Sequence, residues 1–295
     1  MKRSLLLFAV VPVSLLAACG DPTTSSSPST SVVVPPSTTG GGGTSAEIPH
    51  PTGADDVVLR VAYVGGFVPA GVAFANLPSL LITGDGRVLE QGAVAAIYPG
   101  PLMSPLLERT LTPEGIQKVL QEAQRLGLLA APPDYSAEQN IADVPDTVVT
   151  IAAAGGTFVH TAPALGMDDT ELTPARQALF DFVRATGDLP ALVGADLGSD
   201  EPFTPETVRL QATPIDRSTV TTDVPPTFVD WPAGADVSLA AAASCAVTAT
   251  SAVIQALDDA TTITFFVEDG VTYSVVAAPV LPGDAATSLS TDAPC

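Results

Sequence analysis

Three short turns, each between two apolar runs, constrain the fold of this chain more than any other feature. The turns are Asp85-Gly86, Gly155-Gly156 and Asp269-Gly270. Such dipeptides favour the left-handed backbone of two-residue loops, so the pattern is typical of β-hairpins. Hairpins join neighbouring strands and predict mainly antiparallel pairing. The paired runs are 79–83 with 87–91, 147–154 with 157–161, and 261–268 with 271–277.

The turns also predict register. With Asp269-Gly270 as the loop, Phe266 faces Tyr273 and Phe265 faces Ser274. With Gly155-Gly156 as the loop, His160 lies opposite Ile151.

Two helices are predicted to begin at Leu-Thr-Pro sequences. In Leu111-Thr112-Pro113 the threonine can cap the helix and the proline fits its first position. Apolar residues follow at helical spacing, and Gly127 ends the helix. Leu172-Thr173-Pro174 repeats this pattern, with Gly187 at the end. The hairpin and helix unit therefore occurs twice, either as a structural repeat or because one good capping sequence is used twice.

The order of elements predicts an α+β fold with mainly antiparallel sheet and about three helices. The first strand is expected at 57–64, an edge strand at 207–212, and the third helix at about 251–258. Trp231 is expected in the core. The uncharged segment 237–257 is too rich in Ala, Ser and Thr for a membrane span.

The N-terminus has the layout of a secretory signal. Lys2 and Arg3 precede the apolar run 5–16, and two alanines and Cys19 follow. A run of this length is too short for a transmembrane helix, which needs about 20 residues.

Leu16-Ala17-Ala18-Cys19 resembles the lipobox of bacterial lipoproteins. The resemblance implies that residues 1–18 are a signal peptide and that the Cys19 thiol receives a diacylglyceryl group. Two or more acyl chains suit stable membrane anchoring. The alternative is an ordinary secretory signal with an incidental cysteine.

Residues 19–52 are expected to form a tether. Most of the segment consists of Ser, Thr, Pro and Gly, and it has no aromatic residue. Such a sequence cannot bury enough surface to offset the entropy of ordering, so it predicts a flexible linker. His50, near its end, is expected to be solvated. The globular region is then 53–295, either undivided or split into subdomains 53–195 and 200–295.

The charge of the chain limits its partners. The net charge is −21, and removing Lys2 and Arg3 with the signal changes it to −23. Such a polyanion repels nucleic acid and gains nothing from anionic membrane surfaces. The lipid on Cys19 is therefore the expected membrane attachment, at the extracytoplasmic face of the cell membrane. A cell-wall or protein partner stays open.

Cys245 and Cys295 remain for a disulfide. Secretion permits oxidation, and the bridge would close a loop of about 50 residues. The chain-entropy model gives roughly 4 kcal/mol of stabilisation for such a loop. The alternative is two free thiols.

Catalytic signatures are missing from the sequence. It has no G-x-S-x-G or S-x-x-K motif, no Walker loop and no dinucleotide G-x-G-x-x-G. His160 is predicted to be a packed or surface strand residue. Asp196, Asp200 and Glu201 offer oxygen ligands for calcium but lack EF-hand spacing, which favours a surface loop. No catalytic residue, cofactor or metal site is expected.

The globular part is also similar to lipoproteins and secreted proteins of actinobacteria to which no activity is assigned. The residues that carry the similarity are Gly65-Gly66-Phe67, Asp85-Gly86-Arg87-Val88, Ile97-Tyr98-Pro99-Gly100-Pro101 and the pair Cys245 and Cys295. The similarity implies no mechanism. Two hypotheses follow from the residues: a non-catalytic binding or structural module, or an envelope hydrolase that uses Asp and Glu residues without a recognisable motif.

Overall fold

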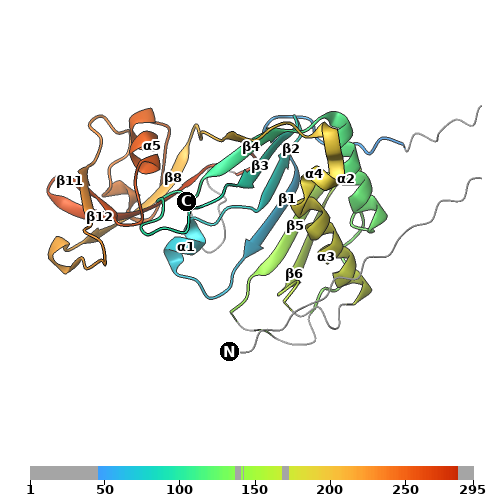
Figure 1. Cartoon of the computed structure of the whole chain (residues 1–295), viewed down its shortest axis with the longest axis horizontal. Helices are drawn as coiled ribbons and strands as arrows, with labels where there is room; N and C mark the ends of the chain where they lie inside the picture. The colour runs from blue at the N-terminus through green and yellow to red at the C-terminus, as the bar shows by residue number, and fades with distance from the viewer. Residues whose placement is uncertain (1–45, 137–140, 142, 168–172, 285–295) are drawn as a thin grey trace, which may run out of the picture. The chain divides into compact units, whose positions relative to one another are not determined.

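Two antiparallel-rich sheets dominate the computed structural model, which describes residues 46–136, 141, 143–167 and 173–284 (Figure 1). The larger sheet has the strand order β6-β5-β1-β2-β3-β4-β7, and all of its pairs are antiparallel. Its strands are β1 (Val57–Val64), β2 (Leu80–Thr83), β3 (Arg87–Gln91), β4 (Leu106–Thr110), β5 (Asp146–Ala153), β6 (Gly156–Pro163) and β7 (Glu201–Pro202).

The smaller sheet has the order β10-β8-β12-β11-β9, with one parallel pair between β9 and β11. Its strands are β8 (Val208–Ile215), β9 (Thr227–Asp230), β10 (Ala246–Thr248), β11 (Thr264–Glu268) and β12 (Val271–Pro279). The predicted α+β class with mainly antiparallel sheet is confirmed.

The described residues form five α-helices, where about three were predicted. They are α1 (Ala70–Phe74), α2 (Pro113–Arg125), α3 (Pro174–Gly187), α4 (Leu189–Val193) and α5 (Ser251–Asp258). The three predicted helices are α2, α3 and α5. The two missed helices, α1 and α4, have five residues each, too few to show a helical period.

The threonine caps are confirmed. The Thr112 side chain accepts a hydrogen bond from the Gly115 N–H at 3.1 Å, and the Thr173 side chain accepts one from the Arg176 N–H at 3.3 Å. Each cap satisfies a backbone donor that the first turn leaves without a helical partner.

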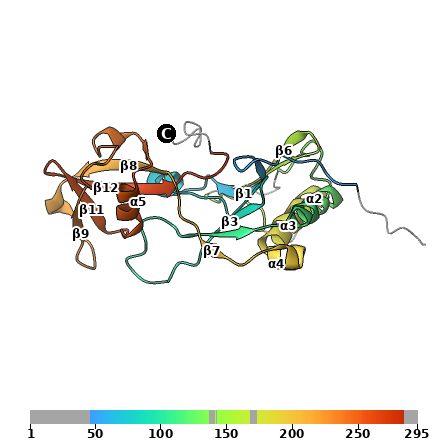
Figure 2. The same cartoon turned by 90° about the horizontal axis from the view of Figure 1, so that it is seen from above.

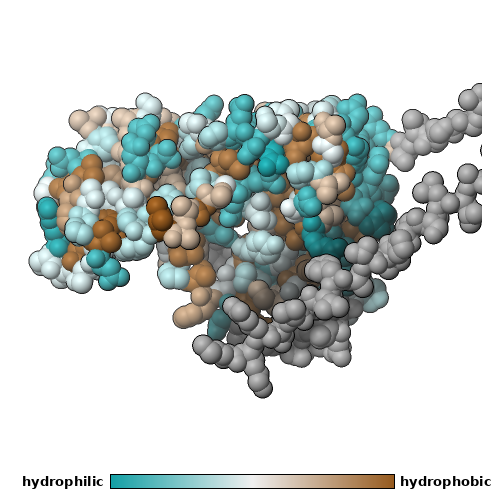
Figure 3. All heavy atoms as spheres, viewed as in Figure 1, coloured by the Kyte–Doolittle hydropathy of each residue, from teal (hydrophilic) through white to brown (hydrophobic). Residues whose placement is uncertain are grey.

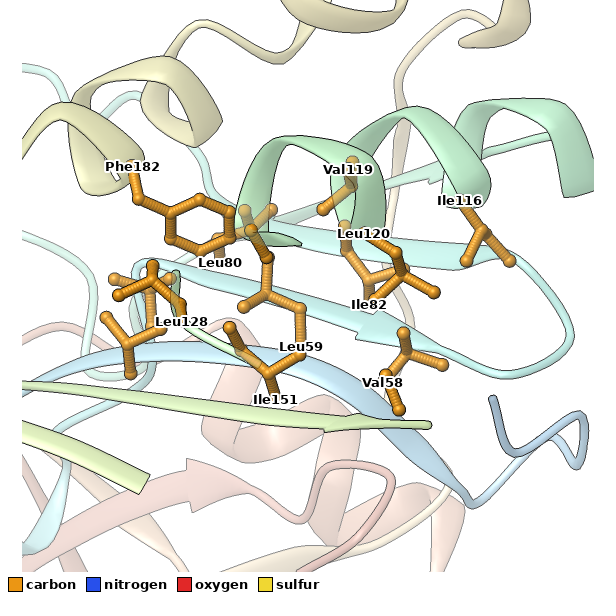
Figure 4. Packing of buried hydrophobic residues seen from close by; sticks show 14 of the residues in the cluster. Val58, Leu59, Leu80, Ile82, Ile116, Val119, Leu120, Leu128, Ile151 and Phe182 are labelled. Carbon is orange, nitrogen blue, oxygen red and sulfur yellow. The ribbon is translucent and has the colours of Figure 1, made fainter. Parts of the chain in front are cut away.

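Helices α2, α3 and α4 lie together over one face of the larger sheet, and α5 lies against the smaller sheet (Figure 2). Figure 4 shows the main core, in which α2 and the Phe182 ring of α3 pack on β1, β2 and β5. The labelled side chains are Val58, Leu59, Leu80, Ile82, Ile116, Val119, Leu120, Leu128, Ile151 and Phe182. Trp231 is buried in the core of the smaller sheet, as predicted.

One predicted register is confirmed and one is wrong. Phe266 faces Tyr273 and Phe265 faces Ser274 across the third hairpin. In the second hairpin the loop is Ala154-Gly155, so His160 faces Val149 rather than Ile151. This register places His160 and Ala162 on the buried face of the strand, and the gain in burial offsets the positive φ of 52° at Ala154.

Two further expectations are corrected. Strand β8 is flanked by β10 and β12, so the run predicted as an edge strand is interior to the smaller sheet. The tether cannot extend to residue 52, because Ile48 is buried in the main core and its backbone exchanges two hydrogen bonds with the Gln117 side chain.

His50, which was expected to be solvated, is half-buried, and its Nδ1 lies 2.7 Å from the Pro51 carbonyl oxygen. No helix within the described ranges is long and apolar enough to cross a membrane.

Candidate ligand-binding site

A cavity of about 570 Å³ lies on the face of β1 and β5 opposite helices α2, α3 and α4. Its lining includes Arg60 and Ala62 from β1, and Val148 and Thr150 from β5. Helix α1 and the residues around it supply further lining, as do Asp143 and Pro145. The volume falls in the range of small-molecule sites, about 300–1,000 Å³.

Strand alternation explains why this floor differs from the core. Successive side chains of a strand point to opposite faces of the sheet. In β5, Val149 and Ile151 are buried under the helices, whereas Val148 and Thr150 face the cavity. In the same way Val61 of β1 belongs to the core, and Arg60 and Ala62 line the cavity.

The rim of the cavity is apolar and exposed. Tyr63, Val68 and Val72 are exposed there, and the neighbouring Phe67 is 87% exposed. Figure 3 shows hydrophobic surface over α1 and the loop before it. A contiguous exposed apolar patch of this kind marks an interaction or ligand site in many soluble proteins.

Two glycines shape the loop that carries Phe67. Gly65 and Gly66 have φ values of 82° and 79°, a region that residues with a Cβ rarely adopt. A Cβ on Gly66 would also meet the Asp143 carbonyl oxygen at 3.3 Å. The Phe67 N–H donates to that same oxygen, at 3.4 Å. Backbone contacts therefore hold this loop against Asp143, which also lines the cavity.

Two arginines line the cavity, and one buried carboxylate contacts both. Asp284 Oδ1 lies 2.7 Å from Arg60 Nη1, and Asp284 Oδ2 lies 3.6 Å from Arg209 Nη1. The Asp284 side chain is only 4% exposed. Arg209 Nη2 also donates to the carbonyl oxygens of Phe74 and Asn76, at 3.0 and 3.3 Å. Burial lowers the pKa of Arg209, and the charge of Asp284 acts in the opposite direction.

Arg60 is the more accessible of the two cations. Its side chain is 30% exposed, and its hydrogen bond to Asp284 uses Nη1. Within the described part of the chain, its other N–H groups have no hydrogen-bond partner. The cavity thus combines a largely apolar wall with one guanidinium edge that a ligand can reach.

His160 has a structural place. It is fully buried, with Nε2 at 2.9 Å from the Leu128 carbonyl oxygen and Nδ1 at 2.7 Å from the Tyr135 hydroxyl. A carbonyl only accepts, so Nε2 carries the proton and Nδ1 accepts from Tyr135. Burial lowers the pKa of His160, against a smaller opposing effect of the Leu128 carbonyl. These two hydrogen bonds link β6 to the 128–135 segment in the interior of the protein.

The residues weighed as calcium ligands do not form a site. Asp196 pairs with Lys118 at 2.7 Å, and the Lys118 ammonium also donates to the Val193 carbonyl oxygen. Lys118 thus bridges α2 to the end of α4. The hydrogen bond from Lys118 lowers the pKa of Asp196. Glu201 lies in β7, and the described ranges hold no group of three His, Cys, Asp or Glu side chains suited to a metal.

A second hollow, of about 620 Å³, is the more acidic one. Its lining includes Asp55, Glu108, Glu206 and Asp284, together with Arg87. Asp284 is held there by Arg60 and Arg209.

Two of the three cysteines lie outside the described residues. Cys245 takes part in a disulfide bond. Cys19 and Cys295 are outside the described ranges, so the lipid on Cys19 and the pairing of Cys245 with Cys295 stay predictions.

Sequence reasoning missed the cavity residues. Arg60 is the single charge within the apolar strand β1, and Phe67 follows two glycines. Both features indicate that one face of this strand and the loop after it do not pack in the core. Arg209 sits beside apolar neighbours in β8 in the same way. Comparison with protein-family models, with curated proteins and with solved structures finds no match to this chain.

Proposed function

We propose that this protein is a non-catalytic ligand-binding module, held at the extracytoplasmic face of the cell membrane by a lipid on Cys19. The observation that carries the proposal is the cavity on the face of β1 and β5 opposite α2, α3 and α4, with its apolar rim and single accessible guanidinium. Orientation by a few polar groups in an otherwise apolar cavity is the usual composition of a small-molecule site.

The lining favours binding over hydrolysis. Among the described residues that line the cavity, Asp143 supplies the single carboxylate, and no histidine, serine or cysteine is present. Glycoside hydrolysis generally uses two carboxyl groups on opposite sides of the scissile bond. Nucleophilic catalysis needs a nucleophile with an adjacent base.

Anchoring is the second part of the proposal. With the packed chain beginning near Ile48, residues 19–45 are left as the tether. A random coil of that length spans about 30 Å, enough to hold the cavity clear of the bilayer. Replacing Cys19 with Ser should move the protein from the membrane fraction to the soluble fraction; retention in the membrane would show that the anchor is elsewhere.

Binding can be tested with a neutral environment-sensitive dye, 1-N-phenylnaphthylamine, and the full chain carrying Cys19→Ser. We expect saturable fluorescence enhancement. Thr150→Trp, on the cavity floor, should weaken dye binding at least fivefold by filling the space.

Thr157→Trp is the matched control, since Thr157 lies in the partner strand β6 and does not line the cavity. It should leave dye binding unchanged. Absence of saturable binding to the unaltered cavity, or equal loss in both variants, would refute the cavity as a ligand site.

A further inference from the structure

We propose that the cavity binds a single-chain amphiphile with an anionic headgroup, a carboxylate or a phosphate, placed on Arg60 with its alkyl chain along the apolar wall. The inference rests on the proposed function and assigns the chemical class of its ligand.

The headgroup preference follows from the guanidinium of Arg60. A guanidinium presents paired donors in a planar fork that matches a carboxylate or phosphate. Asp284 binds Nη1 of Arg60 and so fixes the side chain with its remaining donors unused by described residues. Arg209 cannot serve equally, because it is buried and already bonded to Phe74, Asn76 and Asp284.

The charge of the whole molecule sharpens this preference. A chain with a net charge of −21 repels anions over most of its surface. An anionic ligand can therefore bind only where a cation is locally accessible and the surroundings favour the rest of the ligand. Arg60 meets the first condition and the cavity wall meets the second.

The alkyl part of the ligand follows from the wall. Apolar side chains that line the cavity include Val64, Val68, Val72, Phe74, Leu77 and Val148. Beside them, the Asn76 amide already donates to the Tyr63 carbonyl oxygen at 2.6 Å. A sugar or another polar metabolite would lose hydrogen bonds to water that this wall does not replace.

The two ends of the cavity differ in charge, and this difference sets the orientation of the bound amphiphile. Arg60 faces Thr150 across the β1–β5 pair, and the end of β1 at Val64 faces Asp146. Four residues of strand separate these positions by about 13 Å. Asp143 lies near the Val64 end, where Gly66 contacts its backbone. An anion is disfavoured beside Asp143, so the headgroup belongs at Arg60 and the chain points toward Phe67.

The test compares ligands that share a twelve-carbon chain and differ only in headgroup: dodecanoate, monododecyl phosphate, dodecanol and dodecyltrimethylammonium. Each displaces the neutral dye from the full chain carrying Cys19→Ser, below its critical micelle concentration. We expect at least one anion to bind tenfold or more tightly than the alcohol and the ammonium. The better of the two anions distinguishes a carboxylate source from a phosphate source.

A chain-length series gives a second readout. Each buried methylene contributes a roughly fourfold gain in affinity, so affinity along the series octanoate, decanoate and dodecanoate should rise by about fifteenfold per two carbons until the cavity is filled. Equal affinity along the series would overturn the placement of the chain in the cavity.

Variants then assign the headgroup site. Arg60→Gln should reduce the preference for anion over alcohol to less than threefold, while dye binding and the circular dichroism spectrum report that the cavity is intact. Arg60→Lys should retain most of the preference. Arg87→Gln is the matched control, because Arg87 is a similarly half-exposed arginine paired with an aspartate outside this cavity.

The outcomes separate the two proposals. If dodecanol and the ammonium displace the dye as well as the anions do, the anionic class is wrong and the binding function stands. If the dye binds but no amphiphile displaces it, the inference is again wrong. If neither dye nor amphiphile binds, the proposed function itself fails.

Discussion

Arg60 and Asp284 are 224 positions apart in the sequence, and their charged groups lie 2.7 Å apart. Arg60 belongs to β1 of the larger sheet, and Asp284 follows β12 of the smaller one. The second oxygen of Asp284 contacts Arg209 of β8 and accepts the Leu281 N–H. One buried carboxylate thus joins both sheets and orients the accessible cation of the cavity.

Replacing Asp284 with Asn should therefore lower the free energy of unfolding. The variant keeps the shape of the side chain but removes the charge between two arginines, one of them buried. Since Arg60 is partly exposed and screened, we expect a loss of about 2 kcal/mol. Chemical denaturation followed by circular dichroism measures it. Asp269→Asn, in an exposed hairpin turn, should change stability by less than about 0.5 kcal/mol; equal effects would deny Asp284 this role.

The turn glycines should differ sharply in their tolerance of alanine. A Cβ on Gly86 would lie 2.2 Å from the Leu111 carbonyl oxygen, and the Gly86 oxygen itself accepts the Leu111 N–H at 2.7 Å. The backbone has no room to yield, so Gly86→Ala should cost about 3 kcal/mol or more. Gly155 has a similar φ but no atom within 4 Å of its Cβ position, so Gly155→Ala should cost about 1 kcal/mol. Thermal and urea unfolding of the two variants compare them directly.

Features set by nearby residues were predictable from the sequence. Thr112 and Pro113 together mark the start of α2, and Asp269-Gly270 sets the register of its hairpin. The register of the β5–β6 hairpin was not predictable, because Gly155-Gly156 and Ala154-Gly155 both permit a two-residue loop. Burial of His160 and Ala162 decides between them, and burial depends on the helices above.

The cavity depends on groups that local patterns cannot bring together. Arg60, Arg209 and Asp284 come from three distant parts of the chain, and nothing in their neighbours predicts that they meet. The short helix α1, which forms one wall, lies below the length at which helices are stable alone, so its surroundings hold it in place. The lone Arg60 within an apolar strand was the readable part of the site.

His160 should make stability fall in mild acid. Burial keeps its pKa below the unfolded value of 6.5, so the unfolded chain binds more protons than the folded one at pH values below about 6.5. The stabilisation is fully present above that pH and declines as pH falls toward the folded pKa. We expect the unfolding free energy of the unaltered protein to decrease between pH 7 and pH 5 more steeply than that of His160→Leu.

The same variant checks the hydrogen bonds. At pH 7.5 His160→Leu should be less stable by about 2 kcal/mol, because the Leu128 carbonyl and the Tyr135 hydroxyl lose their partner. Parallel pH profiles for the two proteins would show that the pKa of His160 is the same in the folded and unfolded states.

Ala154 is where a single substitution should stabilise the protein. It has a φ of 52° at the first position of the β5–β6 loop and precedes Gly155, which also has a positive φ. Asn-Gly is the preferred dipeptide for such a loop, whereas a left-handed alanine costs roughly 1–2 kcal/mol. Ala154→Asn should therefore raise the free energy of unfolding by about 1 kcal/mol. Ala152→Asn, two residues earlier in the strand, should lower it. If Ala154→Asn and Gly156→Ala both destabilise the protein, the loop is one residue later than the structure places it, because Gly156 would then need a positive φ.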